Sequence, residues 1–207
     1  MPLLGKKERE QIKQIFDQNL LKEVTLVMFT QNINCQYCNE TKMIVEELAE
    51  LSDKVKAEVY NFAIDKDKKE KFGIDKAPAI VILGEDNKDY GIRFFGIPSG
   101  YEFTTLIEDI VDVSREETQL MDESWQALSS LEVPLHVQVF ITPTCPYCPR
   151  MVRLAHKFAL ATPKIRADMV EVIEFPHLGE MYQVMGVPKT VINDIVEFES
   201  AVPEEYF

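Results

Sequence analysis

Cysteine is scarce in this sequence of 207 residues, and the placement of the few cysteines restricts what they do. There are four, at Cys35, Cys38, Cys145 and Cys148, and they form two Cys-x-x-Cys pairs. A small secreted scaffold stapled by disulfides uses many more cysteines, spread along the chain. With so few cysteines, we expect either redox-active thiols or metal ligands.

Long apolar runs and positive charge are also missing. No run of about 18 apolar residues occurs, which argues against a transmembrane helix. The first ten residues lack the apolar segment of a secretory signal peptide. The chain has 22 Lys and Arg against 35 Asp and Glu, a net charge of -13, which disfavours contact with nucleic acid or anionic lipid. We therefore expect a cytoplasmic protein that binds neither nucleic acid nor membranes.

What the sequence does contain is an internal repeat. The pair in Asn34–Cys38 recurs 110 residues later in Thr144–Cys148. In both halves, 43 residues separate the first cysteine from a proline that opens an apolar run, Pro78 and Pro188. Because a chance recurrence of a tetrapeptide would not preserve this downstream spacing, the repeat is one of architecture.

The pattern predicts an α/β fold of two tandem units, each with a central mixed β-sheet flanked by helices. Apart from the strands that follow the prolines, strands are expected at 24–29, 57–64, 137–141 and 169–175. We expect a hairpin with a two-residue turn at Asn193-Asp194. The units are expected at 1–117 and 118–207, with a stiff join near 114–119. The second unit is expected to be truncated in its last helix.

A Cys-x-x-Cys pair between a strand and a helix is suited to disulfide exchange. The attacking species is the thiolate, and unpaired amides at a helix N-terminus favour its negative charge. Asn34 and Thr144 are suitable N-cap residues directly before the pairs. We expect Cys35 and Cys145 to attack, and Cys38 and Cys148 to resolve the mixed disulfide. The two sites are expected to differ, because Gln36-Tyr37 is replaced by Pro146-Tyr147 and because Pro149 is expected to distort the start of the second helix.

With these motifs, the sequence resembles thioredoxins, glutaredoxins and protein disulfide isomerases, and 137–148 is glutaredoxin-like. The whole chain is most similar to the protein disulfide oxidoreductases of thermophilic archaea and bacteria. The resemblance implies that Pro78 and Pro188 are cis-prolines. Together with Ala77, Val187, Tyr37 and Tyr147, they are then expected to contact the substrate.

The resemblance also implies partners and an electron source. Substrates would be protein disulfides and dithiols. No cofactor would be bound, and electrons would come from NADPH through a thioredoxin reductase-type flavoenzyme, with a peroxiredoxin as a further partner. Two family features are absent: neither 24–29 nor 137–141 contains a carboxylate to accept a proton, and 195–202 lacks the Gly-Gly turn that binds glutathione.

Three alternatives remain open. The four thiolates could hold one zinc ion, although zinc ribbons place their pairs far closer in sequence and we expect no metal site. The chain could be a dedicated electron relay, similar to the tandem N-terminal unit of alkyl hydroperoxide reductase flavoproteins, but that family keeps only one of its two pairs. It could also be a binding or chaperone module with incidental thiols. His136, His156 and His177 are expected to be structural.

Overall fold

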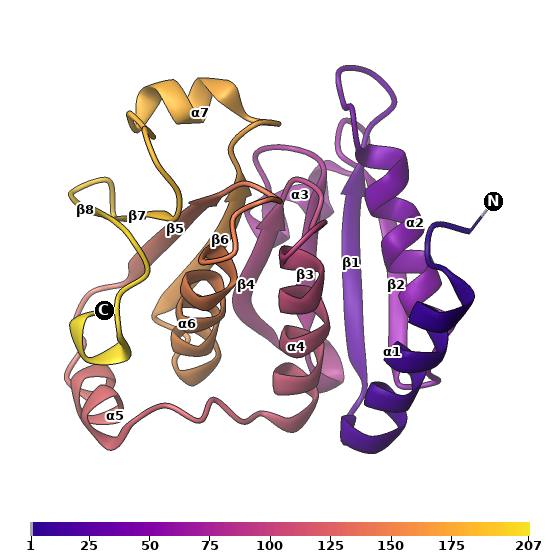
Figure 1. Cartoon of the computed structure of the whole chain (residues 1–207), viewed down its shortest axis with the longest axis horizontal. Helices are drawn as coiled ribbons and strands as arrows, with labels where there is room; N and C mark the ends of the chain where they lie inside the picture. The colour runs from indigo at the N-terminus through magenta and orange to yellow at the C-terminus, as the bar shows by residue number, and fades with distance from the viewer. Residues whose placement is uncertain (1) are drawn as a thin grey trace.

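The computed structural model describes residues 2–207 and forms one body of alternating helices and strands (Figure 1). The helices are α1 (Lys6–Asn19), α2 (Cys38–Ala49), α3 (Lys66–Phe72), α4 (Glu102–Arg115), α5 (Asp122–Ser129), α6 (Cys148–Ala161) and α7 (Pro176–Met181), with short 3-10 turns at Glu85–Asn87 and Glu204–Tyr206. The strands are β1 (Val24–Thr30), β2 (Val55–Asn61), β3 (Ala79–Leu83), β4 (Asp89–Phe95), β5 (Leu135–Ile141), β6 (Ile165–Glu171), β7 (Lys189–Ile192) and β8 (Val196–Glu199).

Both halves follow the order helix, strand, helix, strand, helix, strand, strand, and their strands form one mixed sheet. The strand order is β2-β1-β3-β4-β6-β5-β7-β8. Strands β1 and β5 each pair in parallel with the next strand and antiparallel with the third strand of their own half. The two halves meet where β4 pairs in parallel with β6. The predicted α/β architecture is therefore confirmed, and the two sheets are continuous.

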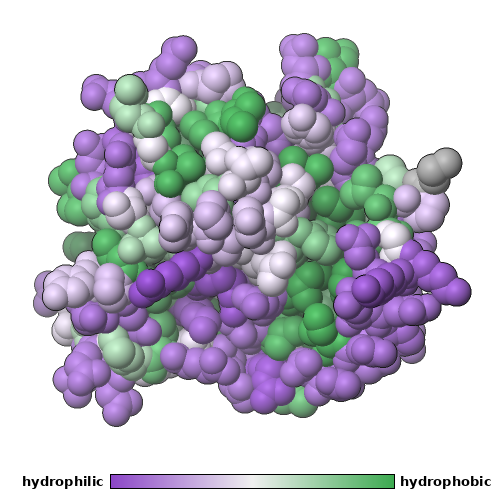
Figure 2. Space-filling view, viewed as in Figure 1, coloured by the Kyte–Doolittle hydropathy of each residue, from purple (hydrophilic) through white to green (hydrophobic). Residues whose placement is uncertain are grey.

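Helices cover both faces of this sheet unequally. Helices α1, α2, α4 and α6 lie on the face toward the viewer in Figure 1, and α3 and α7 belong to the other side. Successive side chains of a strand point to opposite faces of the sheet, so each strand contributes to both hydrophobic cores. In β1, Leu26 and Met28 belong to the core on one face, and Val27 and Phe29 to the core on the other. Figure 2 shows hydrophilic residues along the lower rim of the helical face, with hydrophobic patches between the helices.

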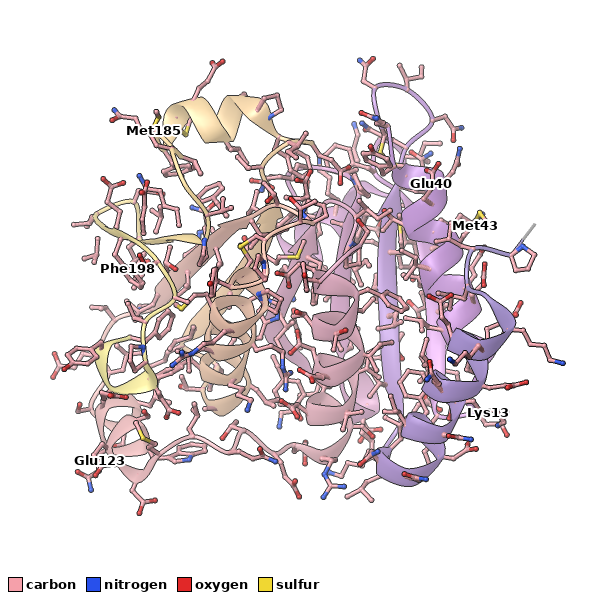
Figure 3. All side chains as sticks on the ribbon, viewed as in Figure 1. Lys13, Glu40, Met43, Glu123, Met185 and Phe198 are labelled. Carbon is pink, nitrogen blue, oxygen red and sulfur yellow. A yellow bond between two sulfur atoms is a disulfide. The ribbon has the colours of Figure 1, made fainter. Side chains whose placement is uncertain are left out.

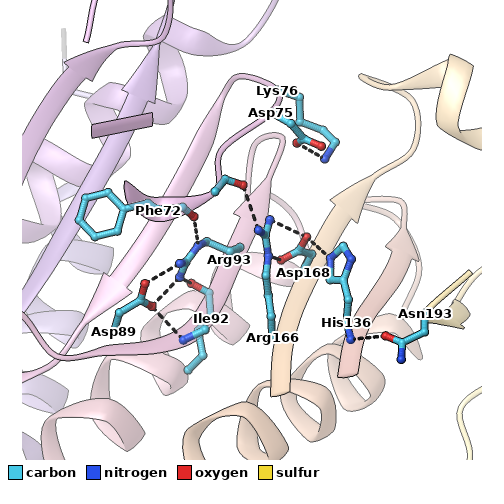
Figure 4. A network of polar contacts seen from close by, with 12 residues as sticks. Phe72, Asp75, Lys76, Asp89, Ile92, Arg93, His136, Arg166, Asp168 and Asn193 are labelled. Carbon is cyan, nitrogen blue, oxygen red and sulfur yellow. Dashed lines mark hydrogen bonds and ion pairs between the residues drawn. The ribbon is translucent and has the colours of Figure 1, made fainter. Parts of the chain in front are cut away.

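Where the halves meet, the backbones of β4 and β6 approach each other closely at Gly91. Gly91 has a φ of 81°, and a Cβ there would lie 2.7 Å from the carbonyl oxygen of Ile165, so the position requires glycine. A polar network lies beside the seam (Figure 4). Arg93 donates to Asp89, and Arg166 pairs with Asp168 and donates to the carbonyl oxygen of Gly73 at 2.9 Å. His136 Nε2 lies 2.7 Å from the buried carboxylate of Asp168.

Helices α4 and α6 make a second contact between the halves. Arg153 of α6 forms ion pairs with Asp109, with Asp112 at 2.7 Å and with Glu108 at 3.0 Å, all on α4. His156 is buried, lies 2.6 Å from Asp109 and packs edge-on against the ring of Phe94. His156 thus joins the two halves, in agreement with the structural role expected for it.

Several predicted boundaries differ from the structure. The second strand of each half begins earlier than expected, at Val55 and Ile165. The turn between β7 and β8 has three residues, 193–195, because Ile192 pairs with Val196. Pro149 is the second residue of a regular α6, where a missing N–H has no intrahelical partner to lose, so the expected distortion is wrong.

Across residues 2–207 no helix is long and apolar enough to cross a membrane.

Candidate active site

Both cysteine pairs open on the same edge of the sheet. The first follows β1 and the second follows β5, and the chain of pairings makes these two strands parallel. Both pairs therefore lie at the upper edge in Figure 1, where α2 and α6 begin. Four strand spacings separate β1 from β5, which corresponds to about 19 Å.

Each pair forms a disulfide, and each helix begins at the second cysteine. Cys35 bonds to Cys38 and Cys145 to Cys148, with 5.5 Å between the Cα atoms in both. Tyr37 and Tyr147 occupy the N-cap positions. The predicted N-caps Asn34 and Thr144 are therefore wrong, because a loop of several residues separates each strand from its helix. Asn34 instead has a left-handed backbone, with a φ of 55°.

The sulfurs of the two pairs have different surroundings. The backbone amide of Cys148, at the N-terminus of α6, points at Sγ of Cys145 from 3.1 Å. Such an amide stabilises negative charge on the sulfur that we expect to attack. In the first pair, the amide of Gln31 points instead at Sγ of the second cysteine, Cys38, from 3.3 Å. Cys145 is mostly buried, while Cys35 is half-buried.

The prolines predicted to be cis are confirmed as such. The Ala77–Pro78 and Val187–Pro188 peptide bonds are both cis. Sγ of Cys145 lies 3.7 Å from the carbonyl oxygen of Val187, so the second pair and its proline loop are in contact. Each proline carbonyl accepts one hydrogen bond at 3.0 Å, from the amide of Gly96 in the first half and of Ser200 in the second.

A groove of about 410 Å³ lies beside the second proline. It is lined by Tyr147, Gly186, Val187, Pro188, Glu199, Ser200 and Ala201. Tyr147 is 69% exposed, and Met185, which precedes the groove-lining loop, is 90% exposed and projects from the molecule in Figure 3. Of these residues, sequence reasoning had identified Tyr147, Val187 and Pro188. Met185 and Glu199 were missed because nothing in their sequence context marks them.

A buried carboxylic acid at the join between the halves was also missed. Glu102, at the start of α4, is 0% exposed, and neither carboxyl oxygen has a hydrogen-bond partner. Burial raises the pKa of Glu102 to about 7. Its one signal in the sequence is the spacing of Glu102, Thr105 and Asp109, which places three polar residues on one face of α4.

The position of Glu102 relative to the second pair follows from helix geometry. Helices α4 and α6 lie side by side on one face and run in the same direction, since each follows one of the parallel strands β4 and β5. Asp109 contacts His156, and seven residues toward either N-terminus is about 10 Å. That step leads to Glu102 on α4 and to Pro149 on α6, next to Cys148. The amide of Tyr101 donates to the carbonyl oxygen of Pro143, in the loop before Cys145.

The geometry does not support one zinc ion shared by the two pairs. Zinc–sulfur bonds are about 2.3 Å long, so four thiolates on one ion lie within a few ångströms of one another. The two pairs are instead on strands about 19 Å apart. Among residues 2–207, no group of three or more His, Cys, Asp or Glu side chains is arranged to hold a metal ion.

Comparison with known proteins shows similarity to thioredoxin domains and to a solved domain of the same fold. The thioredoxin-domain family profile matches residues 135–207. The crystal structure of the N-terminal domain of alkyl hydroperoxide reductase AhpF from Enterococcus faecalis is 27% identical, with a TM-score of 0.88, over 98% of this chain and 96% of that one. An NADH dehydrogenase of Ferdinandcohnia aciditolerans is 25% identical over 184 residues. These make up 88% of this chain and 33% of that relative, so the chain spans about a third of its length.

The crystal structure of a protein disulfide oxidoreductase from Aeropyrum pernix K1 is similar over nearly the whole chain. It is 31% identical, with a TM-score of 0.89, and the match covers 97% of this chain and 89% of that one. Because the match covers 97% of this chain, it extends over both halves, and each half of this chain holds one Cys-x-x-Cys pair and one proline loop. The chain therefore belongs to the protein disulfide oxidoreductases, thiol–disulfide oxidoreductases built from two thioredoxin-like units.

Proposed function

We propose that the chain exchanges disulfides with protein substrates at both sites, and that the second site carries most of the exchange. The observation that carries this proposal is the arrangement around Cys145. A helix amide points at its sulfur, and an open groove runs beside the proline loop that the sulfur contacts. An extended substrate segment in that groove would bring its own sulfur to Cys145.

The proposed reduction of a substrate proceeds in two exchanges. The Cys145 thiolate attacks one sulfur of the substrate disulfide, which forms a mixed disulfide and releases the other substrate sulfur as a thiolate. The Cys148 thiolate then attacks Cys145, which closes the Cys145–Cys148 disulfide and releases the second substrate sulfur. Two electrons pass from the protein dithiol to the substrate disulfide, and two protons end on the substrate thiols. Oxidation of a substrate dithiol is the reverse.

We propose Glu102 as the group that takes the proton from Cys148 before the second exchange. The carboxyl group is enclosed at the level of Cys148, and its pKa of about 7 suits proton transfer near neutral pH. The strands before the cysteines contain no carboxylate that could accept a proton. In this proposal Glu102 of the first unit takes that role for the cysteine pair of the second unit. In this proposal residues 1–117 and 118–207 are two units that share one catalytic apparatus.

The electron supply is also a proposal. No cofactor is needed for the exchange itself, because the cysteines carry the electrons. The similarity to the N-terminal domain of an alkyl hydroperoxide reductase supports a flavoenzyme of the thioredoxin reductase type, fed by NADPH, as donor, with a peroxiredoxin as one acceptor. The same similarity favours the electron relay as a second candidate function. Two intact pairs support the broader exchange activity.

Trapping of mixed disulfides tests the exchange. A Cys148→Ser variant keeps the attacking sulfur and removes the one that resolves, so substrate proteins should accumulate on Cys145. After incubation with an oxidised protein mixture and alkylation, non-reducing gels and peptide mass spectrometry identify the attached cysteine. Cys38→Ser should trap less on Cys35. The variant without any cysteine is the control. No adduct on Cys145 in Cys148→Ser would contradict the proposal.

A further inference from the structure

The two proline loops differ in charge at equivalent positions. In each half, the residue after the cis-proline pairs with the last residue of the neighbouring strand: Ala79 with Phe95, and Lys189 with Glu199. The next residue, Gly96 or Ser200, donates its amide to the proline carbonyl with φ near +95° (93° and 99°). Phe95 and Glu199 therefore occupy the same place beside the two sites.

In the first half this place is apolar and closed. Phe95 is completely buried, and the ammonium group of Lys76 lies 3.8 Å above its ring while paired with Asp75 at 2.6 Å. The second half crowds this corner as well, because a Cβ on Gly96 would lie 2.5 Å from Cβ of Glu171. The carboxylate of Glu174 also reaches this corner, 2.8 Å from where a Cβ on Gly96 would lie, but it already accepts the amide of Ile97. The charge at the first proline loop is therefore hydrogen-bonded within the fold.

In the second half the same place holds an exposed carboxylate. Gly186 stands where the first half has Lys76, two residues before the cis-proline, and a Cβ on it would lie 3.5 Å from Oε2 of Glu199. Glu199 is exposed and lines the groove with Tyr147 and Pro188. Its neighbour Glu197 pairs with Lys189 at 3.0 Å. Within residues 2–207, no cationic side chain lies within ion-pair distance of Glu199.

We propose that Glu199 makes the second site select substrate segments that carry a lysine or arginine beside the reacting cysteine. The inference rests on the proposed disulfide exchange at Cys145 and adds its substrate class. A segment that passes between Tyr147 and the Pro188–Ser200 corner places its side chains next to this unpaired carboxylate, and a basic side chain completes the ion pair that the fold leaves open. An acidic segment meets repulsion there.

The test uses synthetic peptides and a single reacting site. Three homodimeric peptide disulfides differ only in the residues flanking cysteine, which are lysine, glutamine or glutamate. The full chain carrying Cys35→Ser and Cys38→Ser is pre-reduced, and the appearance of peptide thiols is followed by acid quench and chromatography. The measured quantity is the reduction rate of the lysine-flanked peptide divided by that of the glutamate-flanked peptide. Flanking charge also alters the intrinsic reactivity of each peptide, but this contribution is the same for every protein variant and cancels when the ratio is compared between variants.

Glu199→Gln should lower this ratio by about threefold at low ionic strength, and Glu199→Lys should lower it further, by about tenfold. The effect should shrink in 0.5 M salt, where charges are screened within about 4 Å. Glu132→Gln is the control, since it makes the same change in net charge at an exposed residue outside the groove, and it should leave the ratio within about 1.5-fold of the parent.

Two outcomes overturn different statements. If Glu199→Gln changes the ratio no more than Glu132→Gln does, the role of Glu199 is wrong. If the glutamine-flanked peptide is not reduced at all by the parent, while dithiothreitol reduces it, the exchange at Cys145 itself is wrong.

Discussion

Glu102 is fully buried on α4, the helix that packs on α6, and has no hydrogen-bond partner, so its protonation contributes to the stability of the fold. Burial raises its pKa from 4.5 to about 7. Between these values the folded chain holds a proton that the unfolded chain has released, so the free energy of unfolding falls as pH rises through this window. Below pH 4.5 both the folded and the unfolded chain hold the proton, so Glu102 no longer makes the free energy of unfolding depend on pH.

A Glu102→Gln variant cannot ionise, so it should escape this loss. We expect it to match the parent at pH 4.5 and to be more stable at pH 8, by up to about 3 kcal/mol for a shift of this size. Urea unfolding at both pH values measures the difference, with the exposed Glu132→Gln as control. A gain that is equal at both pH values would show that Glu102 is not a buried titrating acid. If Glu102 is also the proton acceptor, the variant should slow release of trapped substrate although it is more stable.

Single residues differ in how well the sequence identifies them. The cysteine pairs and their prolines could be identified because the spacing of 43 residues is repeated, and the cis conformation of the prolines followed from the family resemblance. Glu102 and Glu199 were not, since each acts from a segment far from the cysteines in sequence. Asn34 was misassigned as an N-cap because its residue type suits both an N-cap and the left-handed conformation that it adopts.

Among the elements, the packing of α4 on α6 depends on one arginine. Arg153 neutralises Asp109 and Asp112, which are otherwise close together and mostly buried. Arg153→Met should destabilise the chain by on the order of 3 kcal/mol, because Asp112 loses its ion-pair partner and Asp109 keeps only His156, in a poorly solvated place. Arg115→Met is the matched control, since Arg115 pairs with Glu117 at the surface, and it should cost less than about 1 kcal/mol. Equal losses in chemical denaturation would contradict a special role for Arg153.

The type and order of the elements followed from periodicity, but their ends did not. Apolar β-branched runs marked β1 and β5 closely, whereas β2 and β6 begin with the mixed segments at Val55 and Ile165. The first turn of α2 and α6 was expected too early, because a helix and a loop of similar polarity cannot be separated without the backbone hydrogen bonds. The pairing of β4 with β6 was also beyond sequence reasoning, which predicted two separate sheets.

At the scale of the whole molecule, the two hairpins next to the cis-prolines differ in their surroundings. The β3–β4 hairpin lies in the middle of the eight-stranded sheet, where β4 is largely buried, while β8 is an edge strand with mostly exposed side chains. Amides of β7–β8 should therefore exchange hydrogen faster than those of β3–β4, by at least about tenfold. Hydrogen-exchange mass spectrometry compares the two hairpins within one sample. Equal protection would show that the edge of the second half is covered in solution.

The two cysteine pairs lie at the same edge of the sheet but have different surroundings. We therefore expect them to differ in redox potential and in reaction rate. The amide of Cys148 supports Cys145, and the groove beside Pro188 is open, whereas Phe95 closes the corresponding place in the first half. Differences of this kind alter redox potentials by tens of millivolts, since about 30 mV corresponds to about 1.4 kcal/mol for two electrons. We expect the Cys145–Cys148 pair to be the more oxidising and the faster.

The most direct measurement is the initial rate of insulin reduction by dithiothreitol, catalysed by four forms of the full chain. Cys35→Ser should keep most of the parent rate, Cys145→Ser should lose most of it, and the double variant should be indistinguishable from the uncatalysed reaction. Equal losses in the two single variants would remove the inequality of the sites and leave the oxidoreductase intact. A double variant that still accelerates the reaction would contradict thiol–disulfide exchange at these cysteines.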